Sequence, residues 1–146
     1  MRVVVQRVSK AAVEIDSTVV GAIGVGICIF LGIGQDDTKK DVDFLVRKMS
    51  RLRIFPDEND RMTKSVIDTG GEVLVVSQFT LYGNCRNGCR PDFTRAAPPE
   101  EAKPLYDYFL VEMEKAIGKK VASGRFRAIM DVSLVNDGPV TLVIES

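Results

Sequence analysis

Residues 136–141 read Asn136-Asp137-Gly138-Pro139-Val140-Thr141 and decide how the C-terminal part of the chain folds. Asn and Asp tolerate turn dihedrals, Gly permits a positive φ, and Pro fixes φ. Strand-like apolar runs flank the segment, over residues 132–135 before it and 140–144 after it. Because Pro139 cannot donate a ladder hydrogen bond, we expect a rigid Gly-Pro unit held between two strands.

A second informative segment is Ser77-Gln78-Phe79-Thr80-Leu81, which ends an apolar strand predicted over residues 72–78. It places hydroxyl and amide side chains where the strand gives way to a polar, Gly-containing loop over residues 82–91. An ordinary structural explanation for Ser77 and Thr80 is that strand-end hydroxyls satisfy nearby backbone groups.

The rest of the chain alternates short apolar runs with two helical patterns. Thr38 and Asp41 form a capping-box-like start for a helix with an apolar stripe from Val42 to Leu52, and Pro98 to Glu101 start another that stops at Gly118. Strands are predicted over 3–8, 12–15, 19–23, 26–34, 54–55, 72–78, 125–135 and 140–144. Regular β-α alternation is absent, which disfavours a doubly wound sheet. We therefore predict one compact α/β domain over residues 1–146, with a mainly antiparallel, barrel-like sheet and two long helices.

Composition and charge limit the function. Twenty basic residues balance twenty acidic ones, so a broad, sequence-independent grip on nucleic acid is disfavoured and any RNA contact should be local. No apolar run reaches the roughly 18 residues of a membrane span. The N-terminal segment is too short, and becomes charged too early, for a signal peptide, so we predict that it forms a strand. We therefore expect a cytoplasmic protein without a membrane partner.

The chain has no histidine and three cysteines. Without histidine, Ser-His-Asp and Cys-His catalytic arrangements are excluded, and so is the usual general base at neutral pH. Cys28 lies in an apolar run and is expected to be an inert core residue. Cys85 and Cys89 lie in the polar loop, and two thiols are too few for a zinc site, which needs about four ligands. We therefore expect neither a metal nor a cofactor.

The two segments together resemble the signature motifs of the D-aminoacyl-tRNA deacylases. The resemblance runs over nearly the whole chain, in order, through segments 5–8, 30–32, 53–55, 76–81, 90–91, 93–94, 96–99, 124–126 and 135–141. It implies hydrolysis of the ester bond of D-aminoacyl-tRNA at the 3′ acceptor end, which serves chiral proofreading in translation. It also implies a homodimer with active sites at the subunit interface and a cis Gly138–Pro139 peptide bond.

Ester hydrolysis without histidine requires a positioned water and stabilisation of a tetrahedral oxyanion, which backbone N–H groups can supply. We assign this role to the backbone N–H groups of Phe79 and Thr80, with Gln78 as a further donor in the catalytic segment that begins at Ser77. The resemblance implies that the terminal ribose 2′-hydroxyl helps to activate the water. An alternative is that Thr80 is a nucleophile, but it would need an adjacent base, and the sequence offers no convincing candidate.

Chiral selectivity is assigned to the Gly138-Pro139 backbone, together with Asn136. A rigid carbonyl aimed at the substrate α-carbon would exclude an L side chain and leave room for hydrogen, so glycine, as on mischarged tRNA-Ala, should also be accepted. The resemblance implies that Arg7 fixes the orientation of this motif; an exposed strand arginine is the alternative. Without the resemblance, Gly-Pro would be interpreted as a tight turn.

Two functional alternatives remain on sequence alone. One is a module that binds RNA ends without turnover, and the other is a different small esterase or a relative of the family with altered chirality. Two places also depart from the family pattern: the loop over residues 83–89 is less basic than expected and carries two cysteines, and Arg127 stands where a small residue, often Gly, is expected. The first departure bears on loop contacts with tRNA, and the second bears on a local turn.

Overall fold

The computed structural model describes residues 1–86 and 88–146; Asn87, in the loop between Cys85 and Cys89, lies outside the described residues. The elements follow in chain order: β1 (Arg2–Ile15), β2 (Thr18–Ile23), β3 (Gly26–Gly32), α1 (Lys39–Arg51), β4 (Phe55–Pro56), β5 (Met62–Lys64), β6 (Glu72–Ser77), the short 3₁₀ helix η1 (Phe79–Tyr82), α2 (Pro99–Ile117), β7 (Ala122–Ser123) and β8 (Asp131–Glu145).

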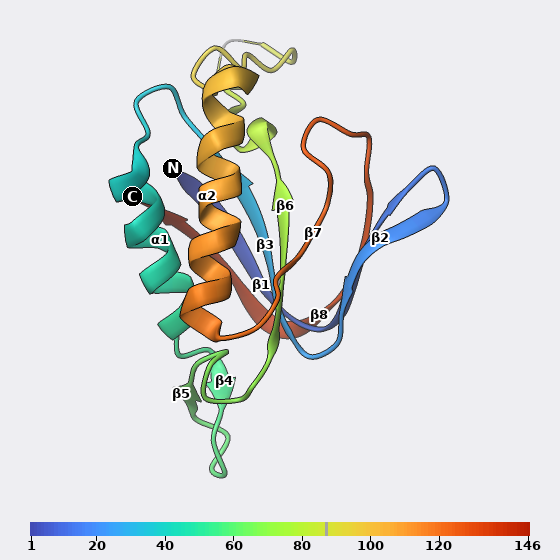
Figure 1. Ribbon diagram of the computed structural model, residues 1–146, viewed down its shortest axis with the longest axis vertical. Coiled ribbons are helices and arrows are strands. Elements are labelled where there is room, and N and C mark those ends of the chain that lie inside the picture. The colour runs from blue at the N-terminus through green and yellow to red at the C-terminus, as the bar shows by residue number, and fades with distance from the viewer. Residues whose placement is uncertain (87) are drawn as a thin grey trace.

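The long strand β1 organises the main sheet (Figure 1). Along one edge it pairs antiparallel with β3 and then with β2, and along the other it pairs antiparallel with β8. Parallel pairs extend the sheet from β3 to β6 and from β6 to β7. β7 returns close to β2, where a Cβ on Gly21 would lie 2.7 Å from the carbonyl oxygen of Ser123. The sheet is therefore nearly closed, which confirms the barrel-like, mainly antiparallel prediction.

Both predicted helices form, and they pack side by side over one face of the sheet (Figure 1). The carboxylate of Asp41 accepts hydrogen bonds from the Thr38 backbone N–H (2.8 Å) and hydroxyl (2.9 Å), which completes the predicted start of α1. At the end of α2, Gly118 adopts φ 70°, a left-handed conformation that favours glycine. Within the described residues, neither helix combines the length and apolarity that a bilayer crossing requires.

Apolar side chains form two clusters, one on each face of the sheet. The larger cluster joins the sheet to the helices through residues such as Leu45, Met49, Phe109 and Met113. The smaller cluster contains Cys28, which is fully buried, and burial raises the pKa of its thiol to about 12. The prediction that Cys28 is an inert core residue is consistent with this environment, because only the thiolate is a strong nucleophile.

Several predicted boundaries were wrong. β1 continues through residues 9–11, where the sequence predicted a break, and residues 125–130 form a turn rather than the start of a strand. The segment over 136–139 does not separate two strands, since β8 runs from Asp131 to Glu145. Both flanks of the segment pair with β1 in the same direction, so the chain bulges there and does not reverse. The 3₁₀ helix η1 was not predicted.

Candidate functional site

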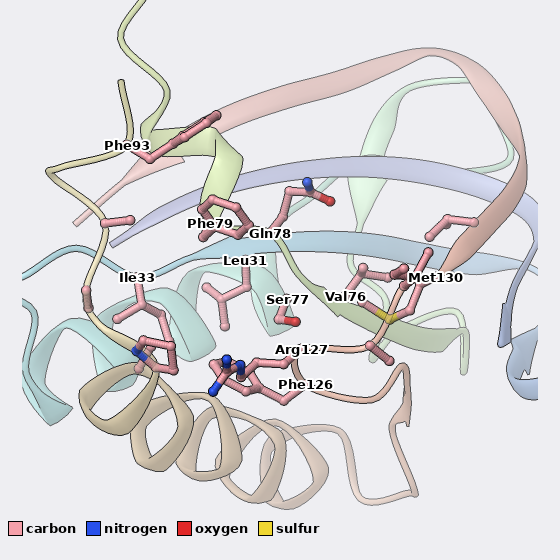
Figure 2. Close-up of a pocket in the computed structure, with 17 residues that line it drawn as sticks. Leu31, Ile33, Val76, Ser77, Gln78, Phe79, Phe93, Phe126, Arg127 and Met130 are labelled. Atoms are coloured by element: carbon pink, nitrogen blue, oxygen red, sulfur yellow. The ribbon is translucent and has the colours of Figure 1, made fainter. Parts of the chain in front are cut away.

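An open cavity of about 640 Å³ lies where β6 ends and η1 begins (Figure 2). Figure 2 shows Phe79 and Phe93 on one side of it and Phe126 and Arg127 on the other, beside α2. Most of the lining is apolar. The residues that line it are Leu31, Ile33, Val76, Ser77, Gln78, Phe79, Phe93, Ala96, Ala97, Pro99, Ala102, Phe126, Arg127, Ala128, Ile129, Met130 and Val132.

The predicted catalytic segment forms the end of β6 and the start of η1. Gln78 still belongs to the sheet through its backbone N–H, which donates to the carbonyl oxygen of Leu31 at 2.8 Å. The next two backbone N–H groups, those of Phe79 and Thr80, have no hydrogen-bond acceptor among residues 1–86 and 88–146. Such unpaired donors are usual in the first turn of a helix. The Gln78 side-chain amide donates to the Thr80 hydroxyl at 2.5 Å, so the two side chains are held together.

The cavity is nearly free of ionisable groups. Arg127 is the one ionisable side chain among the described lining residues, and the lining contains no carboxylate, thiol or phenol. No side chain of the lining can therefore serve as a general base near neutral pH. The chemistry that this arrangement allows depends on backbone dipoles, on Gln78 and Ser77, and on groups that a substrate brings.

The Gly138-Pro139 segment is a bulge of β8 that Arg7 and Asn136 hold in place. Between Gln6 and Val8 on β1, the paired residue on β8 changes from Thr141 to Asn136, so residues 137–140 leave the ladder. The Asn136 side-chain amide closes the bulge, donating to the carbonyl oxygens of Arg7 (2.9 Å) and Val140 (3.0 Å). The peptide bond between Gly138 and Pro139 is cis.

Arg7 is buried, with only 7% of its surface exposed. Its guanidinium donates to the carbonyl oxygen of Ile54 and, at 3.3 Å, to that of Gly138. The Nε atom lies 2.8 Å from the Asp137 carboxylate but is not aligned for a hydrogen bond, so this contact is an ion pair. The alternative that Arg7 is an exposed strand arginine is therefore wrong.

The two groups of predicted residues do not meet within one chain. Ser77, Gln78 and Phe79 line the cavity, whereas the lining contains neither Thr80 nor any residue of the bulge. Nothing lies within 4 Å of a Cβ built on Gly138, so this glycine faces open space in the single chain.

Sequence reasoning missed the segment over residues 126–130 as part of the cavity wall. The backbone N–H of Ala128 donates to the carbonyl oxygen of Arg125 at 3.1 Å, and Arg127 adopts φ 66°. A positive φ at the third position of such a turn normally calls for Gly or Asn. One signal in the sequence could have indicated this turn. The family pattern has a small residue, often Gly, at the position of Arg127, and a small residue at such a position is typical of a turn.

The cysteine pair gives no sign of a metal site. Cys85 and Cys89 are exposed, and no group of three or more His, Cys, Asp or Glu side chains within the described part of the chain is arranged to hold a metal ion.

Known proteins resemble this chain over its whole length. Residues 4–145 match the family model described as D-Tyr-tRNA(Tyr) deacylase. The chain is 57% identical over 146 residues to a D-aminoacyl-tRNA deacylase of Thermotoga petrophila, covering 100% of this chain and 97% of that relative. It is 53% identical to a D-aminoacyl-tRNA deacylase of Bacillus cereus strain G9842, covering 100% of this chain and 99% of that one.

Two solved structures have the same fold. One, titled c-Myc DNA Unwinding Element Binding Protein, superposes with a TM-score of 0.93 at 44% identity and covers 100% of this chain and 99% of its own. The other, titled as a structural analysis of a probable eukaryotic D-amino acid tRNA deacylase, superposes with a TM-score of 0.89 at 17% identity, covers 99% of this chain and 98% of its own, and supports the fold alone. With a family model matched over residues 4–145 and full-length relatives above half identity, the chain belongs to the D-Tyr-tRNA(Tyr) deacylase family of hydrolases.

Proposed function

We propose that this protein binds the 3′ end of D-aminoacyl-tRNA and hydrolyses the ester bond, releasing free tRNA and the D-amino acid. The observation that carries the proposal is the pair of unpaired backbone N–H groups on Phe79 and Thr80, where η1 begins beside a mostly apolar cavity whose described lining contains Arg127 but no carboxylate, thiol or phenol. Family membership supplies the class of substrate. A protein that acts on aminoacyl-tRNA would work in the cytoplasm, where translation takes place.

In the mechanism, water attacks the ester carbonyl, and the tetrahedral oxyanion lies against the N–H groups of Phe79 and Thr80. Preformed backbone donors stabilise charge as it develops and need no proton transfer of their own. Gln78 supplies a third donor or orients Thr80 through their hydrogen bond. Because the lining has no general base, the terminal ribose 2′-hydroxyl of the substrate helps to activate the water, and the 3′-oxygen leaves with the tRNA.

Chiral selection requires a second copy of the chain. The cavity and the Gly138-Pro139 bulge belong to different surfaces of one chain, and Gly138 faces open space. Large apolar side chains are exposed along β8 and at the cavity rim, including Val143 at 64%, Phe79 at 57% and Ile129 at 93%. Exposed apolar surface of this kind is typical of an interface between chains. The proposed homodimer brings the bulge of one subunit to the cavity of the other.

In that dimer the bulge excludes L-aminoacyl groups by backbone contact. Arg7 and Asn136 hold the bulge in one conformation, so the excluded volume is fixed. A glycyl group has no side chain to exclude, and glycyl-tRNA, including tRNA-Ala mischarged with glycine, is therefore also a substrate.

The decisive test is single-turnover deacylation of matched D-, L- and glycyl-tRNA by the purified protein. We expect rapid release from the D form, release from the glycyl form, and little release from the L form. Equal rates for the two enantiomers would reject chiral selection. Tight binding of all three without release would favour an RNA-end binding module. Light scattering at the assay concentration should give the mass of a dimer, and a fully active monomer would reject the interface site.

A further inference from the structure

A second cavity, of about 510 Å³, adjoins the candidate active site on η1 and is strongly basic. Its lining contains three arginines and no carboxylate: Arg2, Tyr82, Gly83, Asn84, Cys85, Arg86 and Arg95. The two cavities share the short helix η1, since Phe79 at its start lines the first and Tyr82 at its end lines the second. Likewise, Arg95 lines the second cavity, whereas the next residue, Ala96, lines the first.

The three arginines are not equivalent. Arg2 is already engaged: its Nε lies 2.5 Å from the Glu145 carboxylate, an Nη donates to the Leu81 carbonyl oxygen at 2.6 Å, and the guanidinium lies 5.2 Å from the centroid of the Tyr82 ring. Arg86 and Arg95 are exposed, and neither forms an ion pair with any residue that the structure describes. The basic cavity therefore carries two guanidinium groups that form no ion pair within the described part of the chain. Arg95 also lines an adjoining cavity that contains the carboxylates of Asp36, Asp37 and Glu145, so Arg86 is the less compensated of the two.

Described contacts hold the two ends of the loop that lines this cavity. The loop is closed by a pair of backbone hydrogen bonds between Asn84 and Asp92, at 2.8 and 3.0 Å. A Cβ on Gly83 would lie 3.0 Å from the Phe93 ring, so the loop packs closely on that ring. Phe93 in turn packs against Phe79, with ring centroids 5.2 Å apart and an edge-to-face orientation. A partly exposed aromatic pair thus lies between the apolar cavity and the basic one.

An aromatic surface beside unpaired arginines has the chemistry that binds single-stranded nucleic acid, in which bases stack on rings and phosphates contact guanidinium groups. The chain has no net charge, so such contact must be local. We infer that Arg86 and Arg95 bind backbone phosphates of the single-stranded 3′ end of the tRNA as it leaves the active-site cavity over η1. This inference rests on the proposed function and names the part of the substrate that the second cavity recognises.

The test compares Arg86→Glu and Arg95→Glu with a matched control, Arg61→Glu. Arg61 is an exposed arginine that directly precedes β5 in the chain. In Figure 1, β5 lies at the end of the molecule opposite the start of α2. All three substitutions change the net charge equally, and all three side chains are exposed, so folding should be preserved. Arg86→Lys and Arg95→Lys serve as conservative variants that keep the charge.

Two esters separate phosphate binding from chemistry: D-tyrosyl-tRNA and D-tyrosyl-adenosine, which carries the same ester but no phosphate. We expect KM for the tRNA ester to rise about tenfold in each Glu variant, with kcat unchanged, because one charge-assisted hydrogen bond to the substrate is removed. Hydrolysis of the adenosine ester should be unchanged, and the Lys variants should recover most of the affinity. An equal loss on both esters, or no difference from Arg61→Glu, would overturn the inference.

Binding of a fluorescein-labelled RNA oligonucleotide ending in CCA tests, without turnover, whether Arg86 and Arg95 bind RNA phosphates. The dissociation constant should rise about tenfold in the Glu variants, and the slope of log K against log salt should become shallower by about 0.7 for each phosphate that the variant no longer binds. If the wild type hydrolyses neither ester, the proposed function fails, yet this measurement still supports or rejects the phosphate site. Unchanged affinity and salt slope in both Glu variants would reject it.

Discussion

The buried guanidinium of Arg7 donates a hydrogen bond of 3.3 Å to the carbonyl oxygen of Gly138. It also donates to the Ile54 carbonyl and contacts the Asp137 carboxylate, so one side chain joins β1, the segment before β4 and the bulge of β8. Planar guanidinium has several donors in a fixed arrangement, which an ammonium group does not provide. The orientation of the bulge therefore depends on arginine at this position.

Arg7→Lys should impair deacylation at least tenfold and lower the free energy of unfolding by about 1–3 kcal/mol, because the buried Ile54 carbonyl oxygen loses its guanidinium donor and the Gly138 carbonyl loses a hydrogen bond. Urea denaturation and single-turnover kinetics measure the two effects. Asp137→Asn is the comparison variant: half of the Asp137 side chain is exposed and Arg7 keeps both carbonyl acceptors, so the loss of stability should be smaller than in Arg7→Lys. A fully active Arg7→Lys variant would show that Arg7 does not set the bulge orientation.

Gly138→Ala tests whether the bulge acts on another subunit. In the single chain the added methyl group meets no atom within 4 Å, so thermal stability of the subunit should change little. If the bulge reaches the cavity of a second copy, the same methyl group should lower D-aminoacyl-tRNA hydrolysis by tenfold or more. Gly70→Ala, outside the bulge, is not a suitable control, because Gly70 has φ 63° and an alanine there would strain the backbone. Unchanged activity in Gly138→Ala would argue against close contact with substrate.

Thr80→Ala distinguishes an orienting threonine from a nucleophile. The Thr80 hydroxyl accepts a hydrogen bond from the Gln78 side-chain amide, which is not a base, and it forms no hydrogen bond with a carboxylate among the described residues. Since the backbone N–H of residue 80 survives the substitution, kcat should fall by less than about tenfold. Mass spectrometry of the wild type during turnover should detect no acyl-enzyme. A covalent acyl group on Thr80 would establish the nucleophile instead.

The sequence predicted local features well because their causes are local. The Thr38–Asp41 capping box and the Gly118 stop lie within a few residues of the helices they delimit, and both formed as predicted. The bulge could not be derived in the same way. Its conformation depends on Arg7 and on the pairing of β1 with β8, through contacts such as that of Asn136 with the Arg7 carbonyl, 129 residues away in the chain.

The cavity shows the same limit. The segment that we propose as catalytic was predicted from polar residues at a strand end, but the opposite wall of the cavity comes from residues 126–130, which the apolar pattern assigned to a strand. The strand begins only after the turn at Arg127, and the surrounding fold imposes the conformation of that turn. That the cavity and the bulge lie on different surfaces of one chain is likewise a property of the tertiary structure.

Arg127→Gly tests the cost of that turn. A left-handed conformation costs a non-glycine residue about 1–2 kcal/mol, and glycine loses part of this advantage through its larger entropy when unfolded. The variant should therefore be more stable by up to about 1 kcal/mol, measured by chemical denaturation. Arg127→Ala, which keeps a Cβ, is the matched control and should gain nothing. Equal stability changes in both variants would assign the effect to the guanidinium rather than to the backbone.

The last prediction concerns the three thiols. Burial raises the pKa of Cys28 to about 12, so very little of it is thiolate near neutral pH and it should resist alkylation in the native protein, whereas exposed Cys85 and Cys89 should react more readily. The raised pKa also means that the folded state holds this proton more tightly, so stability from Cys28 is present below pH 9 and is lost as the pH rises toward 12.

The double variant Cys85→Ser, Cys89→Ser should keep deacylation within about twofold of wild type, with or without chelator, because two thiols fall short of the four ligands of a zinc site. A large loss in that variant, matched by zinc-dependent recovery of chelated wild type, would show that the loop holds a metal between two or more chains.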